Sequence, residues 1–176
     1  TFERSTLSGG LRLKYVIVIS DGEARVDLND PWQFGQEGEQ VGCSARVDEV
    51  TTWLEHSASN RSHGVLIQKE EELELIAPHL ANITMIALTF KDFKDGRAYS
   101  LAYLLRTRFH FKGDLRAVGD VMRDQLSLMR QCGFTSFVIK EGKDPFDALK
   151  GIKGLSVTYS GSVSNPAPLF KRVRRY

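Results

Sequence analysis

The regular alternation of helix-like and strand-like segments after residue 47 constrains the fold of this chain more than any other feature. The run from Ile83 to Phe90, ITMIALTF, is the longest uninterrupted apolar stretch, and such a run is typical of a central strand covered on both faces. From Ala98 to Phe109, apolar residues recur every three or four positions, as on one face of a helix. Repeated alternation of this kind favours right-handed βαβ units and a mostly parallel sheet.

The limits of the other segments follow from the same periodicity and from turn-forming residues. Gly133, after the fourth helix, is a residue type that commonly ends helices. The expected helices are residues 47–56, 70–80, 98–109, 120–132 and 145–149. The strands expected to alternate with them are residues 64–67, 83–90, 115–118, 134–139 and 155–159.

A hairpin is expected before this region. The apolar run from Tyr15 to Ser20 ends at Asp21-Gly22, a dipeptide that favours tight turns, and residues 24–28 can form the returning strand. The segment from Trp32 to Gly42 is polar and glycine-rich, which indicates a loop with room for one short strand. Five parallel strands can form an open doubly wound α/β sheet or part of a (β/α) barrel. We favour the open sheet with the hairpin at an edge, and keep the partial barrel as the alternative.

The chain length of 176 residues fits one domain with a normal core. We expect a flexible start at residues 1–14, a single α/β domain at 15–165 and a basic tail at 166–176. The formal net charge is +2, and four of the basic residues lie in the tail: Lys171, Arg172, Arg174 and Arg175. Without these four the charge is −2, so the folded part has no footprint for nucleic acid.

Cysteine usage argues against a self-contained metal or redox centre. Cys43 and Cys132 are the two cysteines of the chain and form no CxxC motif. They cannot supply a disulfide framework or the four thiolates of the usual iron–sulfur cluster. The four histidines show no metal-binding spacing, and no Gly-rich nucleotide motif is present. We therefore expect no cofactor and no metal, and we expect Cys132 to be a buried hydrophobic residue.

Targeting signals are also missing from the sequence. It has no apolar run approaching the 18 residues of a membrane span and no apolar core of a signal peptide. The expectation is a cytoplasmic protein without a membrane partner.

Two of the predicted strand-to-helix turns are rich in polar groups, at residues 90–97 and 119–125. Ligands of parallel sheets usually bind where such turns meet, at the carboxyl edge. Helix N-termini and arginines there suit an oxyanion or a carboxylate. The candidate catalytic residues are Asp120 and Asp124, and the candidate ligand-binding residues are Asp95, Arg97, Tyr99, Ser100, Arg116 and Arg123.

A structural role competes with this assignment. Asp120 is a good N-cap residue for the fourth helix, and Arg123 and Asp124 can pair with neighbours one turn away. A functional role requires at least one arginine that faces a pocket without a partner.

The same segments carry a family resemblance. Its elements are Asp95-Gly96-Arg97, Tyr99-Ser100, Leu104-Leu105-Arg106, Gly113-Asp114-Leu115-Arg116-Ala117, Gly119-Asp120-Val121, Arg123-Asp124-Gln125 and Cys132-Gly133-Phe134. Over roughly residues 45 to 172 the chain resembles the bacterial domain of unknown function nine-three-four family. The resemblance implies a product of sulfate-assimilation gene clusters, described as an oxidoreductase involved in sulfite reduction.

From this resemblance we expect an accessory protein of assimilatory sulfite reduction, with sulfite reductase or another sulfate-assimilation protein as its partner. If redox chemistry occurs, its cofactor must belong to that partner, because two cysteines cannot hold the usual cluster. The alternative is a stand-alone enzyme that binds a small anion or acidic metabolite at the two turns. A purely structural subunit, including a homo-oligomer, is a third class.

Overall fold

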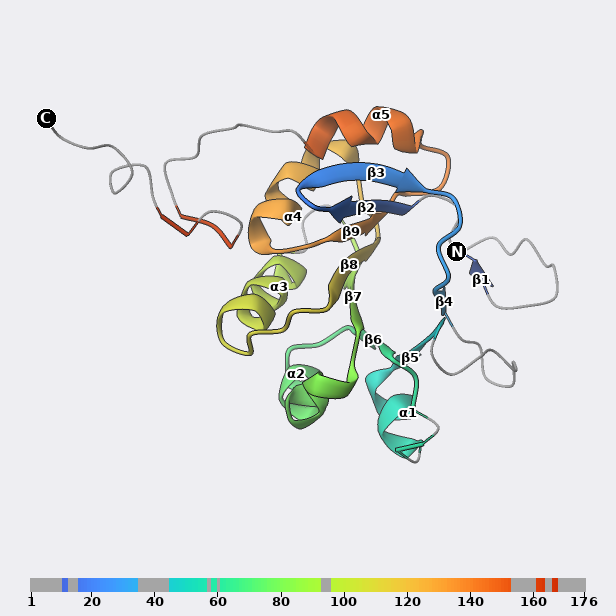
Figure 1. Cartoon of the computed structure of the whole chain (residues 1–176), viewed down its shortest axis with the longest axis vertical. Coiled ribbons are helices and arrows are strands. Elements are labelled where there is room, and N and C mark those ends of the chain that lie inside the picture. The colour runs from blue at the N-terminus through green and yellow to red at the C-terminus, as the bar shows by residue number, and fades with distance from the viewer. Residues whose placement is uncertain are drawn as a thin grey trace, which may run out of the picture.

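The structure, a computed structural model of the 176-residue chain, describes residues 11–12, 16–34, 45–56, 58–59, 61–92, 96–152, 161–163 and 166–167. Within these residues, nine strands form one sheet and the helices lie along it (Figure 1). The expected strand at 155–159 lies outside the described residues, as do most of the expected start and of the basic tail.

The strands of the described residues are two to six residues long, and the α-helices are five to eleven residues long. The strands are β1 Leu11–Arg12, β2 Val16–Ser20, β3 Glu23–Asp27, β4 Gln33–Phe34, β5 Arg46–Glu49, β6 Gly64–Ile67, β7 Met85–Phe90, β8 Asp114–Gly119 and β9 Ser136–Val138. The α-helices are α1 Val50–Glu55, α2 Glu71–Ile76, α3 Arg97–Thr107, α4 Leu126–Cys132 and α5 Pro145–Leu149. The 3₁₀ helices are η2 Ala77–Asn82, η3 Arg123–Gln125 and η4 Lys150–Ile152.

The sheet combines a parallel centre with antiparallel edges. Strands β4 to β9 are parallel and lie side by side in chain order. The β2–β3 hairpin extends the sheet beyond β9, with β2 antiparallel to β9, and β1 pairs with β4 at the other edge. Asp21 (φ 53°) and Gly22 (φ 83°) adopt the left-handed conformations that a tight two-residue hairpin turn needs. The hairpin at an edge of a mostly parallel sheet is therefore confirmed.

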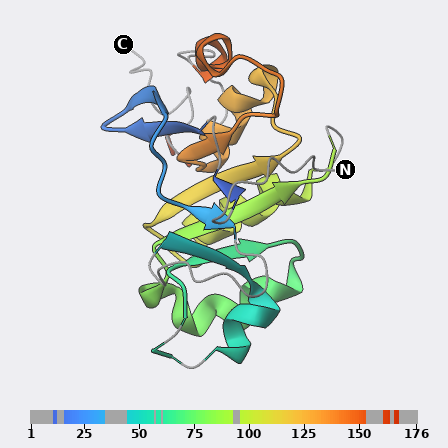
Figure 2. The ribbon, with the colours of Figure 1, turned by 90° about the vertical axis from the view of Figure 1, so that its right-hand side faces the viewer.

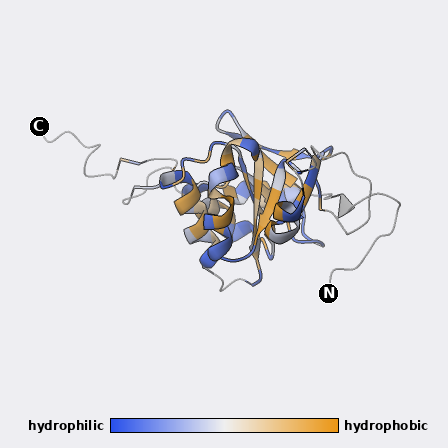
Figure 3. Cartoon of the chain, turned by 90° about the horizontal axis from the view of Figure 1, so that it is seen from below, coloured by the Kyte–Doolittle hydropathy of each residue, from blue (hydrophilic) through white to orange (hydrophobic). Residues whose placement is uncertain are grey.

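The sheet is curled, with the helices on its convex face. Parallel strands in chain order, joined by right-handed connections, place all their helices on one face. Residues of all five α-helices pack with Ile67, Leu88 and Ala117 of the strands in one buried cluster. Figure 2 shows the strands of the sheet side by side, and Figure 3 shows apolar residues, in orange, on the strands and on the helices beside them. This arrangement matches the partial-barrel alternative, and the doubly wound arrangement that we favoured is not observed.

The apolar run at β7 now has a structural explanation. Five of its six residues are buried, because β7 is central and both of its faces are covered. Ile86, Leu88 and Phe90 face the helices, while Met85 and Ala87 belong to a smaller cluster on the concave face. Burial on both faces is what removes the usual alternation of apolar and polar residues.

The sheet must be curled because the link between strands β3 and β4, which crosses its concave face, is short. The chain passes from β3 at one edge to β4 near the opposite edge through residues 28–32. In a flat sheet these strands would be seven spacings apart, about 34 Å. The link, counted from Asp27 to Gln33, reaches at most about 22 Å even when fully extended. The two edges must therefore approach each other, and Figure 1 shows the link descending from β3 to β4.

A buried ion pair, which we call the clasp, fastens this link to the sheet. Arg116 of β8 donates to Asp30 of the link through two nitrogens, at 2.6 and 2.8 Å, and both side chains are 2% exposed. The same guanidinium also contacts Ser136 of β9 at 2.9 Å and Asp114 at 3.2 Å. Two residues farther along the link, Trp32 packs on the concave apolar cluster. The clasp therefore holds the link against the interior of the curled sheet.

Two element boundaries differ from the sequence prediction by three residues, more than most of the others do. Residues 47–49 belong to strand β5, and helix α1 begins only at Val50. The spacing of Val47 and Val50 resembles a helical repeat, but it crosses a junction between strand and helix. Similarly, helical structure after β8 begins at Arg123 and not at Asp120, because Met122 is extended (φ −118°, ψ 157°).

The end of α4 is fixed by Arg106, a residue of α3. Gly133 ends α4 in a left-handed conformation (φ 106°), as predicted. Arg106 of α3 donates from Nε to the Gly133 carbonyl oxygen at 3.0 Å and from Nη1 to those of Phe111 and Gly113. Burial lowers the pKa of Arg106, and the nearby Asp114 carboxylate partly offsets this. Arg106 thus connects α3 to the loop that precedes β8 and to the end of α4.

None of the helices in the described part of the chain combines the length and apolar character that crossing a membrane would require.

Candidate functional site

The two polar turns predicted from the sequence lie side by side at the carboxyl edge of the sheet. Phe90, the last residue of β7, pairs with Gly119, the last residue of β8. The backbone N–H of Asp120 donates to the Phe90 carbonyl oxygen at 2.9 Å. The turns that lead into α3 and α4 therefore begin side by side at the carboxyl edge of the sheet, where ligands of parallel sheets commonly bind.

The first turn leads to Gly96, Arg97, Tyr99 and Ser100. Asp95 lies outside the described residues. Gly96 precedes α3 without a side-chain cap, and Arg97 is the first helical residue. Arg97 and Ser100 are exposed, whereas Tyr99 is half-buried. Arg97 has an interaction partner, so it is not a free cation at this edge.

In the second turn, Asp120 pairs with a lysine and does not cap a helix. Its Oδ1 atom lies 2.7 Å from Nζ of Lys140, which follows β9. The backbone N–H of Lys140 donates to the Val121 carbonyl oxygen at 3.2 Å. This ion pair joins the carboxyl ends of β8 and β9. A proton acceptor role for Asp120 would have to operate with this ammonium group beside it.

Arg123 is also paired. Its Nη1 atom lies 3.0 Å from Oδ2 of Asp147 on α5, and Lys150 approaches the other oxygen of the same carboxylate at 3.3 Å. These side chains are about half exposed or more, so their attraction is screened by solvent and contributes little to stability. The neighbouring Asp124 is exposed.

Tyr99 is a half-buried polar residue of the site. Its ring packs edge-on against Phe90, with centroids 5.0 Å apart. Burial raises the pKa of Tyr99, the nearby Cys132 and Asp124 raise it further, and a hydrogen bond with Gln125 lowers it in part. Burial also raises the pKa of the Cys132 thiol. Both groups therefore favour their neutral, protonated forms, which suits packing more than nucleophilic attack.

The titration of Tyr99 can be tested directly. We expect one tyrosine to ionise at a pH above the ordinary tyrosine range, because the folded-state pKa of Tyr99 is raised. The stability that Tyr99 contributes is fully present below the ordinary pKa and is lost as the pH rises through the folded-state value. Ultraviolet difference absorbance of the phenolate should lose this late step in Tyr99→Phe. The control Tyr103→Phe, on the same helix and 51% exposed, should retain it.

Arg116 is placed apart from the carboxyl edge. It lies in the middle of β8 and points into the concave interior, where the clasp engages it. Among the predicted residues, the structure brings together Tyr99, Asp120, Arg123 and Asp124 along the two turns. A ligand role for Arg116 would require the link to move away from it.

Three residues of this edge were not singled out from the sequence: Lys140, Phe146 and Asp147. Lys140 follows a predicted strand by one residue, so its position at the carboxyl edge could have been inferred. Asp147 and Phe146 belong to the short helix α5, whose Asp144-Pro145 start was recognisable, with the Asp144 side chain accepting from the Phe146 N–H. No sequence signal indicated that α5 would lie beside Arg123.

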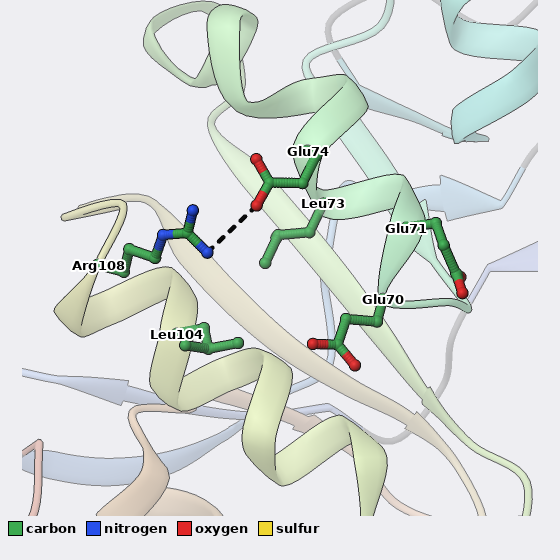
Figure 4. Close-up of a pocket in the computed structure, with 6 residues that line it drawn as sticks. All are labelled: Glu70, Glu71, Leu73, Glu74, Leu104 and Arg108. Atoms are coloured by element: carbon green, nitrogen blue, oxygen red, sulfur yellow. Dashed lines mark ion pairs between the residues drawn. The ribbon is translucent and has the colours of Figure 1, made fainter.

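Two cavities lie away from the two turns. One of about 220 Å³ lies between α2 and α3, lined by three glutamates, two leucines and an arginine (Figure 4). In it, Arg108 pairs with Glu74 at 3.2 Å, and both side chains are exposed. A second cavity, of about 510 Å³, lies at the amino edge near His63 and Thr84, which precede β6 and β7. Neither cavity is lined by a residue of the two turns.

A metal centre is not apparent in the part of the chain that the structure describes, where no three His, Cys, Asp or Glu side chains are arranged to hold an ion. The chemistry available at the carboxyl edge is that of paired charges, a protonated tyrosine and the exposed aromatic ring of Phe146. Such a surface can bind a partner through ion pairs and apolar contact.

Comparison with known proteins gives a family match. Residues 64–170, more than half of the chain, match the family described as "Bacterial protein of unknown function (DUF934)". The matched region contains both turns of the carboxyl edge and all of α5. No curated protein and no solved structure matches the chain.

Proposed function

We propose, from the premise that this chain belongs to the bacterial family of unknown function DUF934, that it is an accessory protein of assimilatory sulfite reduction that acts with sulfite reductase. We assign the contact with the reductase to one surface at the carboxyl edge. This surface, the α5 patch, consists of Arg123, Phe146, Asp147 and Lys150.

The observation that carries this proposal is the exposure of Phe146 beside a network of charges. The Phe146 side chain is 60% exposed, and its neighbour Asp147 binds both Arg123 and Lys150. Aromatic residues and arginine are enriched in protein interfaces, and buried aromatic anchors carry much of the binding energy. A small-anion site would instead direct its cations toward the ligand. Here the Nη1 atom of Arg123 already contacts Asp147.

The cysteine content supports a role beside a redox enzyme. Cys43 and Cys132 are two thiols, and the usual iron–sulfur cluster takes four. In the proposed complex, the redox centres belong to sulfite reductase, and this chain contributes binding.

Substitution of Phe146 tests the α5 patch. With tagged full-length protein in cells grown on sulfate, we expect sulfite reductase to co-purify with the wild type. Phe146→Ala should weaken binding to purified reductase by about 30-fold, the effect of losing an interface residue worth about 2 kcal/mol. The control is Leu75→Ala on α2, another large apolar side chain that is 52% exposed, and it should bind normally.

Calorimetry separates this proposal from the stand-alone enzyme. Failure of intact wild-type protein to bind the reductase would contradict the accessory role. The enzyme alternative instead requires that sulfite binds the isolated chain and that Arg97→Ala and Arg123→Ala lose this binding while remaining folded. In that alternative Asp120 or Asp124 would be the base.

A further inference from the structure

Strand β3 forms an open edge of the sheet. It is the last strand in the sheet order of the described residues, and only β2 pairs with it. Ala24 and Val26 face the helices and pack against the main core, while Glu23 and Arg25 are exposed on the opposite face. An edge strand of five residues can accept another strand, because half of its backbone groups point outward.

The hairpin turn fixes which backbone groups point outward. Asp21 and Gly22 form a two-residue turn, so Ser20 and Glu23 are a hydrogen-bonded pair. Hydrogen-bonded and non-hydrogen-bonded pairs alternate along an antiparallel ladder. The backbone of Arg25, like that of Glu23, therefore points toward β2. The N–H and C=O groups of the residues between, Ala24 and Val26, point away from the sheet.

The charges along this edge alternate in sign: Glu23, Arg25 and Asp27 are separated by apolar residues. Within the described residues, the Arg25 side chain has no ion-pair or hydrogen-bond partner. Asp27 uses Oδ1 to accept from the Asn29 N–H at 2.9 Å, which leaves its second oxygen for another donor. A strand with this pattern is complementary to an antiparallel copy of itself when Arg25 of one copy faces Asp27 of the other.

We propose that two copies of this chain associate through β3, antiparallel, with Val26 opposite Val26 of the second copy. In this register the outward backbone groups of Val26 form the central hydrogen-bonded pair. Arg25 then lies opposite Asp27 of the second copy in a non-hydrogen-bonded position, where side chains approach most closely. The two-fold symmetry repeats this ion pair, as expected for an isologous dimer.

Other registers fit less well. With Arg25 opposite Arg25 of the second copy, two cations would face each other, which is destabilising. With Ala24 at the centre, Val26 and Asp27 of the second copy would run into the turn at Gly22 and Asp21. In the Val26 register, Leu28, which directly follows β3 and is 66% exposed, lies near Ala24 of the second copy.

A charge-reversal pair tests the dimer and its register. Sedimentation of the full chain should show a wild-type dimer. Arg25→Asp places two carboxylates opposite each other, and Asp27→Arg places two guanidinium groups opposite each other. We expect each variant alone to dimerise at least about 10-fold more weakly. An equimolar mixture of the two should recover a heterodimer, because each opposite-charge pair is restored.

Glu71→Arg, an exposed charge reversal on α2, is the matched control and should remain dimeric. Circular dichroism should show that all variants stay folded. A monomeric wild type would overturn the proposal. So would a dimer that both β3 variants leave unchanged, or a mixture that fails to associate. This inference is independent of the proposed role with sulfite reductase.

Discussion

Asp30→Ala should lower the free energy of unfolding by about 3–5 kcal/mol, because it leaves the Arg116 guanidinium buried without its main counter-charge. Arg116 is 2% exposed and cannot reach water without displacing the link. The remaining contacts, to Ser136 and Asp114, do not replace a bidentate carboxylate. Urea denaturation followed by fluorescence of the two tryptophans, Trp32 and Trp53, would measure the loss.

Asp48→Ala is the matched control for this substitution. Asp48 is also buried, and it pairs with Arg46 at 2.9 Å, but the Arg46 side chain is 18% exposed. Arg46 can therefore turn toward solvent, and we expect a loss of about 1–3 kcal/mol. Replacing both clasp partners, with Asp30→Leu and Arg116→Met, should recover part of the Asp30→Ala loss, since no buried charge remains. Equal effects of Asp30→Ala and Asp48→Ala would contradict a special role of the clasp.

Gly119→Ala should destabilise the protein by about 2–5 kcal/mol and disturb the carboxyl edge at the same time. Gly119 has φ 98°, a conformation that costs an L-residue about 1–2 kcal/mol. An added Cβ would also overlap with the Phe90 carbonyl oxygen. Relieving that overlap requires the backbone of β7 or β8 to shift, which typically costs about 1–3 kcal/mol. The same oxygen accepts the Asp120 N–H, so this hydrogen bond would weaken.

Gly142→Ala separates the two causes. Gly142 also has a positive φ, 81°, but no atom lies within 4 Å of the position that an added Cβ would take. Only the conformational cost of about 1–2 kcal/mol should remain in this variant. Thermal and urea denaturation of both variants would show whether close packing against Phe90 adds to the cost. If the two substitutions are equally destabilising, the contact with Phe90 has no energetic effect.

The sequence predicted best those elements whose own residues determine their conformation, such as an apolar strand and a tight turn. The strand predicted at 83–90, which is observed at 85–90, and the hairpin at Asp21-Gly22 were predicted because apolar content and turn chemistry reflect nearby structure. Strand β5 was missed because Val47 and Val50 happen to have helical spacing across a junction. The curl of the sheet depends on the length of the link between β3 and β4. The short link implies a curled sheet only when it is known that β3 and β4 lie near opposite edges. The periodicity of a single sequence does not provide this strand order.

The position of the candidate site could be predicted from the sequence, but the ion-pair partners of its charged residues could not. Alternation of strands and helices placed the turns at 90–97 and 119–125 on one edge, and the pairing of β7 with β8 brings them together. The partners of Asp120 and Arg123 come from 20 and 24 residues farther along the chain. Such pairings depend on how β9 and α5 pack, so side-chain type and local spacing could not reveal them.

The position of the hairpin beside β9 also has a consequence for how the protein is made. Val18 pairs with Ser136, a residue 118 positions later in the chain. At about 5–20 residues per second, a ribosome needs roughly 6–24 s to add the intervening segment. The hairpin therefore emerges from the ribosome early. Val16 and Ile17 stay exposed until the neighbouring strand, β9, has been synthesised. The first long strands to be synthesised are among the last to be docked, and chaperones that bind nascent apolar segments have this interval in which to act.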